Sequence, residues 1–164
     1  MEVIAGWTHR PFPIGDLSCV GEARRHAVRL AGERGWSEVD TERTAIVVTE
    51  LATNLAKHAQ GGELLIAARD ALQDIEVIAV DRGPGMADLE RARRDGFSTS
   101  ATAGTGLGAV ARQSDGFELQ SSPAAGTVSV ARLRRRKALG STQEAAAAHP
   151  RRRFAFGAVC VPVK

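Results

Sequence analysis

Apolar positions spaced as in an amphipathic helix define two helices in the first half of the chain. The first covers "CVGEARRHAVRLAGERG", and Asp16 or Ser18 can cap its start. The second starts at Ser37 or Asp40 and runs through "TERTAIVVTELATNLAKHA" as far as the helix breaker Gly61. This second helix is the longest periodic segment of the chain.

Shorter apolar runs predict strands around these helices. "EVIAGWTHRPFPI" reads as an edge strand that leads into a proline-bounded loop. "GELLIAARD" and "DIEVIAVD" form an antiparallel hairpin with a polar turn at residues 72–74. After a loop with a short helix at 89–94, "GLGAVARQSD" predicts a helix, and "GFELQSS", "PAAG" and "TVSVARL" predict a final hairpin.

Length and composition fit one soluble domain with a short extension. The chain has 164 residues, of which 43% are hydrophobic and 25% charged, enough for one core. No apolar run is long enough to span a bilayer and the start lacks signal-peptide features, so we expect a cytoplasmic protein without membrane contact. The two cysteines, Cys19 and Cys160, are isolated and support neither a disulfide framework nor a zinc site.

The last thirty residues differ from the rest of the chain. Basic runs at 132–137 and 151–153 flank an alanine-rich stretch, so residues 1–133 are predicted to be the domain and 134–150 a linker. A solvated linker explains these runs, and we predict no direct nucleic-acid binding. The tail at 151–164 includes "FAFGAVCVPVK", which resembles the first strand of a PP2C-like phosphatase domain and suggests a fragment of a longer fusion protein.

Three polar residues of the second helix lie at four-residue steps. With Glu50 at zero, Asn54 lies at about 40° and His58 at about 80°, on the rim of the apolar face formed by residues such as Val47 and Leu51. A carboxylate and an amide on this rim could point into a cleft beside the core. The same column could equally be a surface glutamate with an asparagine that pairs locally.

Two glycine-rich stretches follow the second helix. In "DRGPGM", Asp81 lies at the end of a strand, where its carboxylate can accept a hydrogen bond from an exocyclic amine, and Gly83 and Gly85 permit close backbone approach. "AGTGLG", at 103–108, leads into a helix whose free N–H groups favour a polyphosphate. Each stretch alone could be an ordinary turn or loop.

In their order along the chain, these motifs and the later Gly126-Thr127 resemble the nucleotide-binding boxes of the GHKL ATPase/kinase superfamily. The resemblance spans about residues 15–133 and is closest to the anti-sigma regulatory serine/threonine kinases. It implies an α+β fold, the two-layer α/β sandwich called the Bergerat fold. There a mixed, mostly antiparallel sheet is covered by helices on one face, and ATP binds between the helices and a lid.

Carried over to this sequence, the resemblance makes Glu50 the catalytic base and Asn54 the Mg²⁺ ligand. Asp81 matches the residue that selects adenine, and Thr127 matches the hydroxyl that supports it. The two glycines of "DRGPGM", Gly83 and Gly85, shape the adenine pocket. The phosphate-side residues that match are Gly104, Thr105, Gly106, Leu107 and Gly108. His58 occupies a position where the family usually has a basic or polar residue near the phosphates; the alternative is a helix-end histidine with no ligand role.

The resemblance implies an ATP- and Mg²⁺-dependent kinase of a bacterial partner-switching pathway, which phosphorylates a serine on a STAS-domain antagonist. The alternative is a nucleotide-gated binding module that sequesters a sigma factor or activates a PP2C-type phosphatase with little catalysis of its own. A homodimer is left open. Sensor histidine kinases and topoisomerase-type ATPases fit less well, because only about 15 residues precede the first helix and the interval from Met86 to Gly104 is short.

Overall fold

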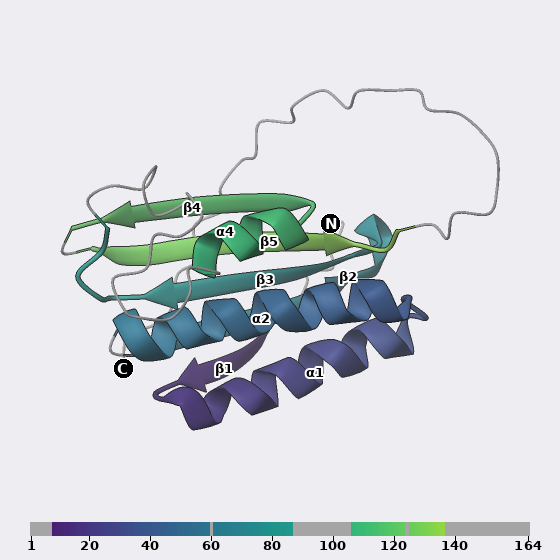
Figure 1. Ribbon diagram of the computed structural model, residues 1–164, viewed down its shortest axis with the longest axis horizontal. Helices are drawn as coiled ribbons and strands as arrows, with labels where there is room; N and C mark the ends of the chain where they lie inside the picture. Colours follow the sequence, from purple (N-terminus) through teal and green to yellow (C-terminus); the bar gives the residue numbers. More distant parts are fainter. Residues whose placement is uncertain (1–7, 60, 87–105, 124, 137–164) are drawn as a thin grey trace, which may run out of the picture.

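Helices cover one face of a five-stranded sheet (Figure 1). The computed structural model describes residues 8–59, 61–86, 106–123 and 125–136. The strands lie in the order β1-β2-β3-β5-β4, and each of the four neighbouring pairs is antiparallel. The α+β class and the two-layer sandwich expected from the sequence are confirmed.

Two hairpins, β2–β3 and β4–β5, supply four of the five strands of the sheet. Its strands are β1 (Arg10–Ile14), β2 (Gly62–Arg69), β3 (Asp74–Asp81), β4 (Gly116–Ser122) and β5 (Gly126–Arg134). The edge position of β1 is confirmed, but the strand covers the segment with Pro11 and Pro13, for which the sequence predicts a loop. The turn between β2 and β3 starts slightly earlier than the sequence indicates. It consists of a 3-10 turn at Asp70–Leu72 and the left-handed residue Gln73, with φ of 53°.

The α-helices that the structure describes lie on the covered face: α1 (Val20–Glu33), α2 (Glu38–His58) and α4 (Gly106–Gln113). Asp16 caps a 3-10 turn just before α1, because its carboxylate accepts a hydrogen bond of 2.7 Å from the backbone N–H of Ser18. Ser37 caps α2 by accepting a bond of 3.1 Å from the N–H of Asp40. The short helix predicted at 89–94 lies outside the described residues.

The core lies between the helices and the sheet. The fully buried residues of α1 are alanines, at positions 23, 27 and 31, and these small side chains let α1 pack closely against α2, while Val20 and Leu30 of α1 are partly buried against the core. The buried residues of α2 and the sheet that complete the core include Val47, Val48, Leu51, Leu55, Leu64, Ile66, Ile75, Val77 and Leu133. None of the helices that the structure describes is long and apolar enough to cross a membrane.

The opposite face of the sheet carries a buried ion cluster. Along β3, Ile75 and Val77 face the helices, so Asp74 and Glu76 point to the other side. Arg69 contacts both of these carboxylates, at 2.6 Å and 2.9 Å. Burial favours the neutral form of Glu76, but hydrogen bonds from His9 and Arg132 and the charges of the two arginines prevail and lower its pKa to about 2.

Candidate functional site

The polar column of α2 lies on the rim of the helix, as its spacing predicts. Glu50 and Asn54 are half-buried on successive turns, and His58 is exposed at the end of the helix. Neither the Glu50 carboxylate nor the Asn54 amide makes a hydrogen bond or ion pair with any residue that the structure describes. The local pairing considered from the sequence is therefore not seen among the described residues.

Asp81 is the last residue of β3 and anchors the loop that follows it. Its Oδ1 atom accepts a hydrogen bond of 2.7 Å from the backbone N–H of Gly83. This loop packs on the end of α2, since a Cβ added at Gly83 would lie 3.0 Å from the Cα atom of Ala59. The absence of a side chain at Gly83 thus brings the strand end that carries Asp81 against the helix that carries Glu50 and Asn54.

Gly85 fixes the other side of the same loop. Its φ of 70° is in the left-handed region, and a Cβ there would collide with the carbonyl oxygen of Ser122. The loop after β3 is therefore held between α2 and the end of β4.

Thr127 lies directly across from Asp81 in the register of β3 and β5. Its hydroxyl forms a hydrogen bond of 2.9 Å with the hydroxyl of Ser121, in which either oxygen could be the donor. Ser121 also accepts a bond of 2.8 Å from the N–H of Met86 and donates one of 3.1 Å to the carbonyl of Gly126. Ser121 thus joins the Asp81 loop to Thr127.

Ser121 is a residue that sequence reasoning missed. It stands in "GFELQSS", where a serine at the end of a strand is indistinguishable from a solvent-facing one. The register with β5 is what places it beside Thr127. Only the expected pairing of the last two strands could have pointed to it.

α4 begins beside the polar rim of α2. The two helices pack side by side above the sheet and run in opposite directions (Figure 1). The carbonyl of Gln113, the last residue of α4, bonds to Arg43 of α2. Along α4, Gly106 lies seven residues before Gln113. Along α2, Glu50 lies seven residues after Arg43. Seven residues make about 10 Å of helix, so the two distances are equal. The start of α4 at Gly106 is therefore level with Glu50.

The first turn of α4 is open at Gly106 and packed at the next two positions. A Cβ added at Gly106 would meet no atom within 4 Å, whereas Gly108 is buried and Leu107 packs against the core. Gly104 and Thr105 lie outside the described residues. An eight-residue helix with an open N-terminus offers backbone N–H groups that suit phosphate oxygens.

The site fits a magnesium ion that is shared with a phosphate ligand. Among the described residues, no group of three or more histidine, cysteine, aspartate or glutamate side chains could hold a metal ion. A Mg²⁺ ion typically takes one or two protein oxygens and completes its shell with substrate phosphates and water. The amide oxygen of Asn54, which has no partner among the described residues, suits that requirement.

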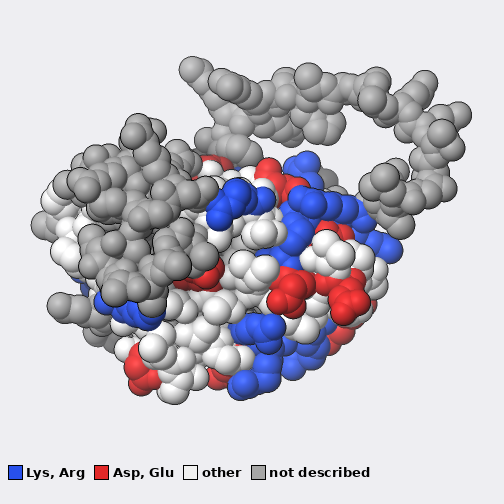
Figure 2. Space-filling view, in the orientation of Figure 1, with Lys and Arg blue, Asp and Glu red and all other residues white. Residues whose placement is uncertain are grey.

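The face of the molecule that carries the helices has both basic and acidic side chains on its described surface. Figure 2 shows basic and acidic side chains interspersed along its lower edge and towards one end. Exposed ion pairs contribute to this pattern, among them Arg24–Glu42 and Arg29–Glu33.

Comparisons with known proteins show the family of this chain. A family model described as a histidine kinase-like ATPase domain matches residues 15–132. Over 124 residues the chain is 37% identical to the serine/threonine-protein kinase RsbT of Bacillus subtilis (strain 168), and the alignment covers 70% of this chain and 93% of that protein. The chain therefore belongs to the histidine kinase-like ATPases of the GHKL superfamily, in the family of anti-sigma regulatory serine/threonine kinases.

Proposed function

We propose that this chain is an ATP-dependent serine/threonine kinase of a partner-switching pathway and that it phosphorylates a serine on a STAS-domain antagonist. The observation that carries the proposal is the placement of Glu50 level with the start of α4 and of Asn54 one turn further along α2, both without a hydrogen-bond partner among the described residues. RsbT, which is 37% identical, is named a serine/threonine-protein kinase.

Each end of ATP has a suitable group in this site. The Oδ2 atom of Asp81 accepts no hydrogen bond from a described residue and would accept one from the adenine amino group. The backbone N–H groups at the start of α4 would bind phosphate oxygens. Asn54 would hold a Mg²⁺ ion, which neutralises phosphate charge when it is bound.

Glu50 is the proposed general base. Its carboxylate would accept the proton of the substrate serine hydroxyl while the serine oxygen forms a bond to the γ-phosphorus. The bond from that phosphorus to the bridging oxygen breaks in the same step, and ADP leaves with that oxygen. Because Glu50 is on a long, capped helix packed in the core, its position is fixed before the substrate arrives.

The test separates chemistry from binding. Glu50→Gln keeps the shape of the side chain but cannot take a proton, so phosphate transfer should fall by about 10² to 10⁴ while ATP affinity is retained. Asn54→Ala should instead weaken the binding of ATP with Mg²⁺. Transfer from ATP labelled on the γ-phosphate to STAS-domain proteins encoded nearby, and calorimetry of ATP binding, provide the two readouts.

Glu38→Gln, on the exposed first turn of the same helix, is the matched control and should change neither quantity. If Glu50→Gln transfers phosphate at the wild-type rate, Glu50 is not the base. If the wild-type chain binds ATP and a STAS or sigma-factor partner but transfers nothing, the chain is a nucleotide-gated binding module.

A further inference from the structure

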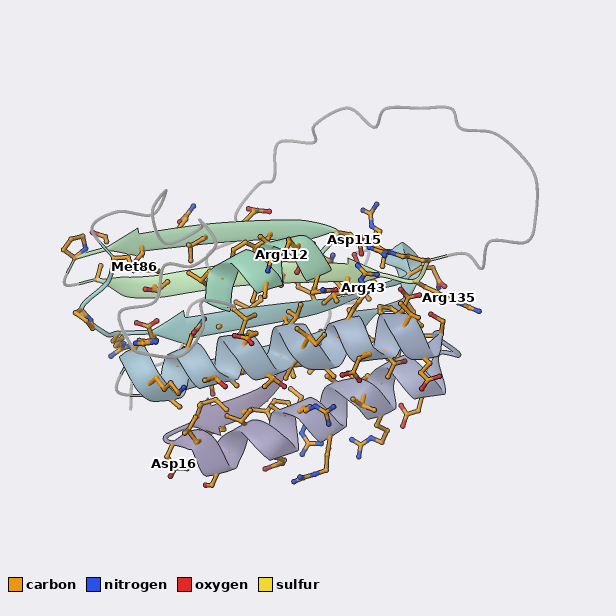
Figure 3. The ribbon with its side chains drawn as sticks, in the orientation of Figure 1. Asp16, Arg43, Met86, Arg112, Asp115 and Arg135 are labelled. Atoms are coloured by element: carbon orange, nitrogen blue, oxygen red, sulfur yellow. The ribbon has the colours of Figure 1, made fainter. Side chains whose placement is uncertain are left out.

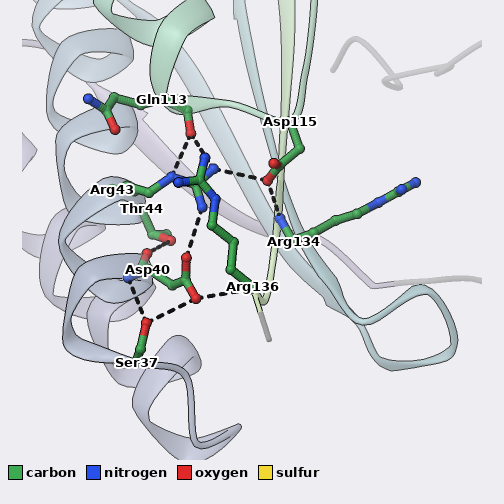
Figure 4. Close-up of polar contacts among 8 residues, drawn as sticks. All are labelled: Ser37, Asp40, Arg43, Thr44, Gln113, Asp115, Arg134 and Arg136. Atoms are coloured by element: carbon green, nitrogen blue, oxygen red, sulfur yellow. Dashed lines mark hydrogen bonds and ion pairs between the residues drawn. The ribbon is translucent and has the colours of Figure 1, made fainter. Parts of the chain in front are cut away.

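A buried polar cluster at the far end of α2 has no part in the chemistry proposed above (Figure 4). Its centre is Arg43, whose side chain is only 6% exposed. The guanidinium donates to Asp40 Oδ1 at 2.8 Å and to Asp115 Oδ2 at 3.0 Å, so one buried cation contacts two carboxylates. Burial disfavours the charged form of Asp40, yet bonds from Arg136, Ser37 and Arg43 outweigh that effect and lower the pKa of Asp40.

Arg43 also holds the end of a second helix. Its Nε and Nη2 atoms both donate to the carbonyl oxygen of Gln113, at 3.1 Å and 2.7 Å. The last carbonyls of a helix have no partner within the helix, and a cation there also interacts favourably with the helix dipole. Arg43 therefore fastens the C-terminus of α4 to α2. Figure 3 shows Arg43 beside Asp115, just beyond the end of α4.

The same cluster holds the end of β5. Asp115 Oδ2 accepts a bond of 2.7 Å from the backbone N–H of Arg134, and Asp40 Oδ2 accepts one of 3.0 Å from the N–H of Arg136. These bonds fix both carboxylates, and the fixed carboxylates in turn orient Arg43. The hydrogen bonds from Arg43 to Gln113 of α4 are therefore made by a side chain that is held in one orientation.

α4 is short, so the position of one end determines the position of the other. Eight residues make about 12 Å of rigid helix, and a tilt at Gln113 displaces Gly106. Gly106 is the end that lies level with Glu50. We propose that Arg43 is a positioning residue for the phosphate end of the ATP site, because it fixes α4 against the helix that carries Glu50 and Asn54. This inference rests on the proposed function, since it assumes that phosphates bind at the start of α4.

The chain contains a matched control for a purely structural role. Arg69 is buried to the same degree, with a side chain 7% exposed, and it contacts Asp74 and Glu76. That cluster lies on the opposite face of the sheet from α4. Loss of either arginine should destabilise the domain, but only Arg43 should affect how phosphates bind.

The experiment compares ATP with AMP, which has the same adenine but lacks the β- and γ-phosphates. Arg43→Lys keeps a positive charge, but a single ammonium group cannot reach Asp40, Gln113 and Asp115 together. We expect the affinity for ATP, measured by calorimetry, to fall about tenfold, the loss expected from a displaced helix N-terminus. The affinity for AMP, measured by NMR titration, should not change. Arg69→Lys should lower the melting temperature and leave the ratio of the two affinities at the wild-type value.

An Arg43→Lys variant that folds and keeps the wild-type ratio would overturn the inference. If that variant does not fold, Asp115→Asn decides, because it weakens the same contact at a side chain that is 29% exposed. Its ratio must fall as well, and an unchanged ratio again overturns the inference. A wild-type chain that binds neither nucleotide would overturn the proposed function and this inference together. If the wild-type chain binds ATP, an unchanged ratio of affinities in the variants overturns only the role of Arg43.

Discussion

The two carboxylate oxygens of Asp81 differ in their contacts. Oδ1 holds the loop through the N–H of Gly83 at 2.7 Å, and Oδ2, which has no partner among the described residues, is the proposed acceptor for adenine. An asparagine can keep the first bond with its carbonyl oxygen. It would place an NH₂ group where the second acceptor was, and that group cannot accept a bond from an adenine amino group.

Asp81→Asn should therefore weaken ATP binding without unfolding the domain. Loss of a charge-assisted hydrogen bond typically costs about 1.5 to 3 kcal/mol, which is roughly ten- to 100-fold in affinity. Calorimetry measures the affinity, and thermal unfolding confirms that the fold is intact. Asp70→Asn, at an exposed carboxylate in the turn between β2 and β3, should bind ATP normally. Equal affinity in both variants would remove Asp81 from the adenine site.

At the scale of elements, the sequence predicted what local chemistry determines. Periodicity located α1, α2 and α4, and the capping pattern correctly offered Ser37 as the start of α2. Alternating apolar residues located β2 and β3. The rim position of Glu50 and Asn54 followed from helical geometry alone.

What the sequence could not predict depends on contacts between distant segments. The position of β5 between β3 and β4 is a matter of pairing, which no local pattern encodes. Arg43 and Asp115 are 72 residues apart and each looks like an ordinary surface charge in the sequence. Their burial comes only from the packing of α4 on α2. The roles assigned to the site residues remain predictions until the variants are measured.

The cap of α2 offers a test at this scale. Ser37 accepts a bond from the N–H of Asp40 and donates one of 3.0 Å to its carboxylate. Ser37→Ala should destabilise the domain by about 1 kcal/mol, the usual cost of losing an N-cap. Urea unfolding measures this, with Ser122→Ala as the control, since the exposed Ser122 makes only a bond of 3.5 Å to Pro123. If Ser122→Ala lowers the free energy of unfolding as much as Ser37→Ala does, the N-cap bond of Ser37 contributes nothing specific to stability.

For the whole molecule, the cluster around Glu76 makes stability depend on pH. The pKa of Glu76 is lowered from 4.5 to about 2 in the folded chain. The folded state thus binds a proton at Glu76 less readily than the unfolded state does. The stabilisation is fully present above about pH 5 and is lost as the pH falls from about 4.5 towards 2. Glu76→Gln should be less stable than the wild type at pH 7, and the difference should shrink towards pH 3.

Urea unfolding at pH 7, 5 and 3 measures this difference. Glu22→Gln, at a side chain that is 64% exposed, is the control and should follow the wild type at each pH. A difference between Glu76→Gln and the wild type that stays constant with pH would show that the ionisation of Glu76 is not linked to folding.

The end of β5 sets where the chain can be shortened. The sequence placed the end of the domain at Leu133, but β5 continues to Arg134 and the N–H of Arg136 bonds to Asp40. A chain that ends at Lys137 should bind ATP as the full chain does, because every proposed ATP contact precedes it. A chain that ends at Leu133 should melt at a lower temperature, because the backbone bonds to Asp115 and Asp40 are lost. A large loss of affinity in the longer of these two chains would show that the tail packs on the domain.

The prolines of β1 have a consequence for how copies of this chain can associate. An edge strand ordinarily presents free N–H and C=O groups on which a further strand can add. Pro11 and Pro13 have no N–H, so the five residues of β1 are a poor template for a new strand. β4, at the opposite edge, has seven residues and no proline. Any assembly or aggregate that extends this sheet by strand addition is therefore directed to β4.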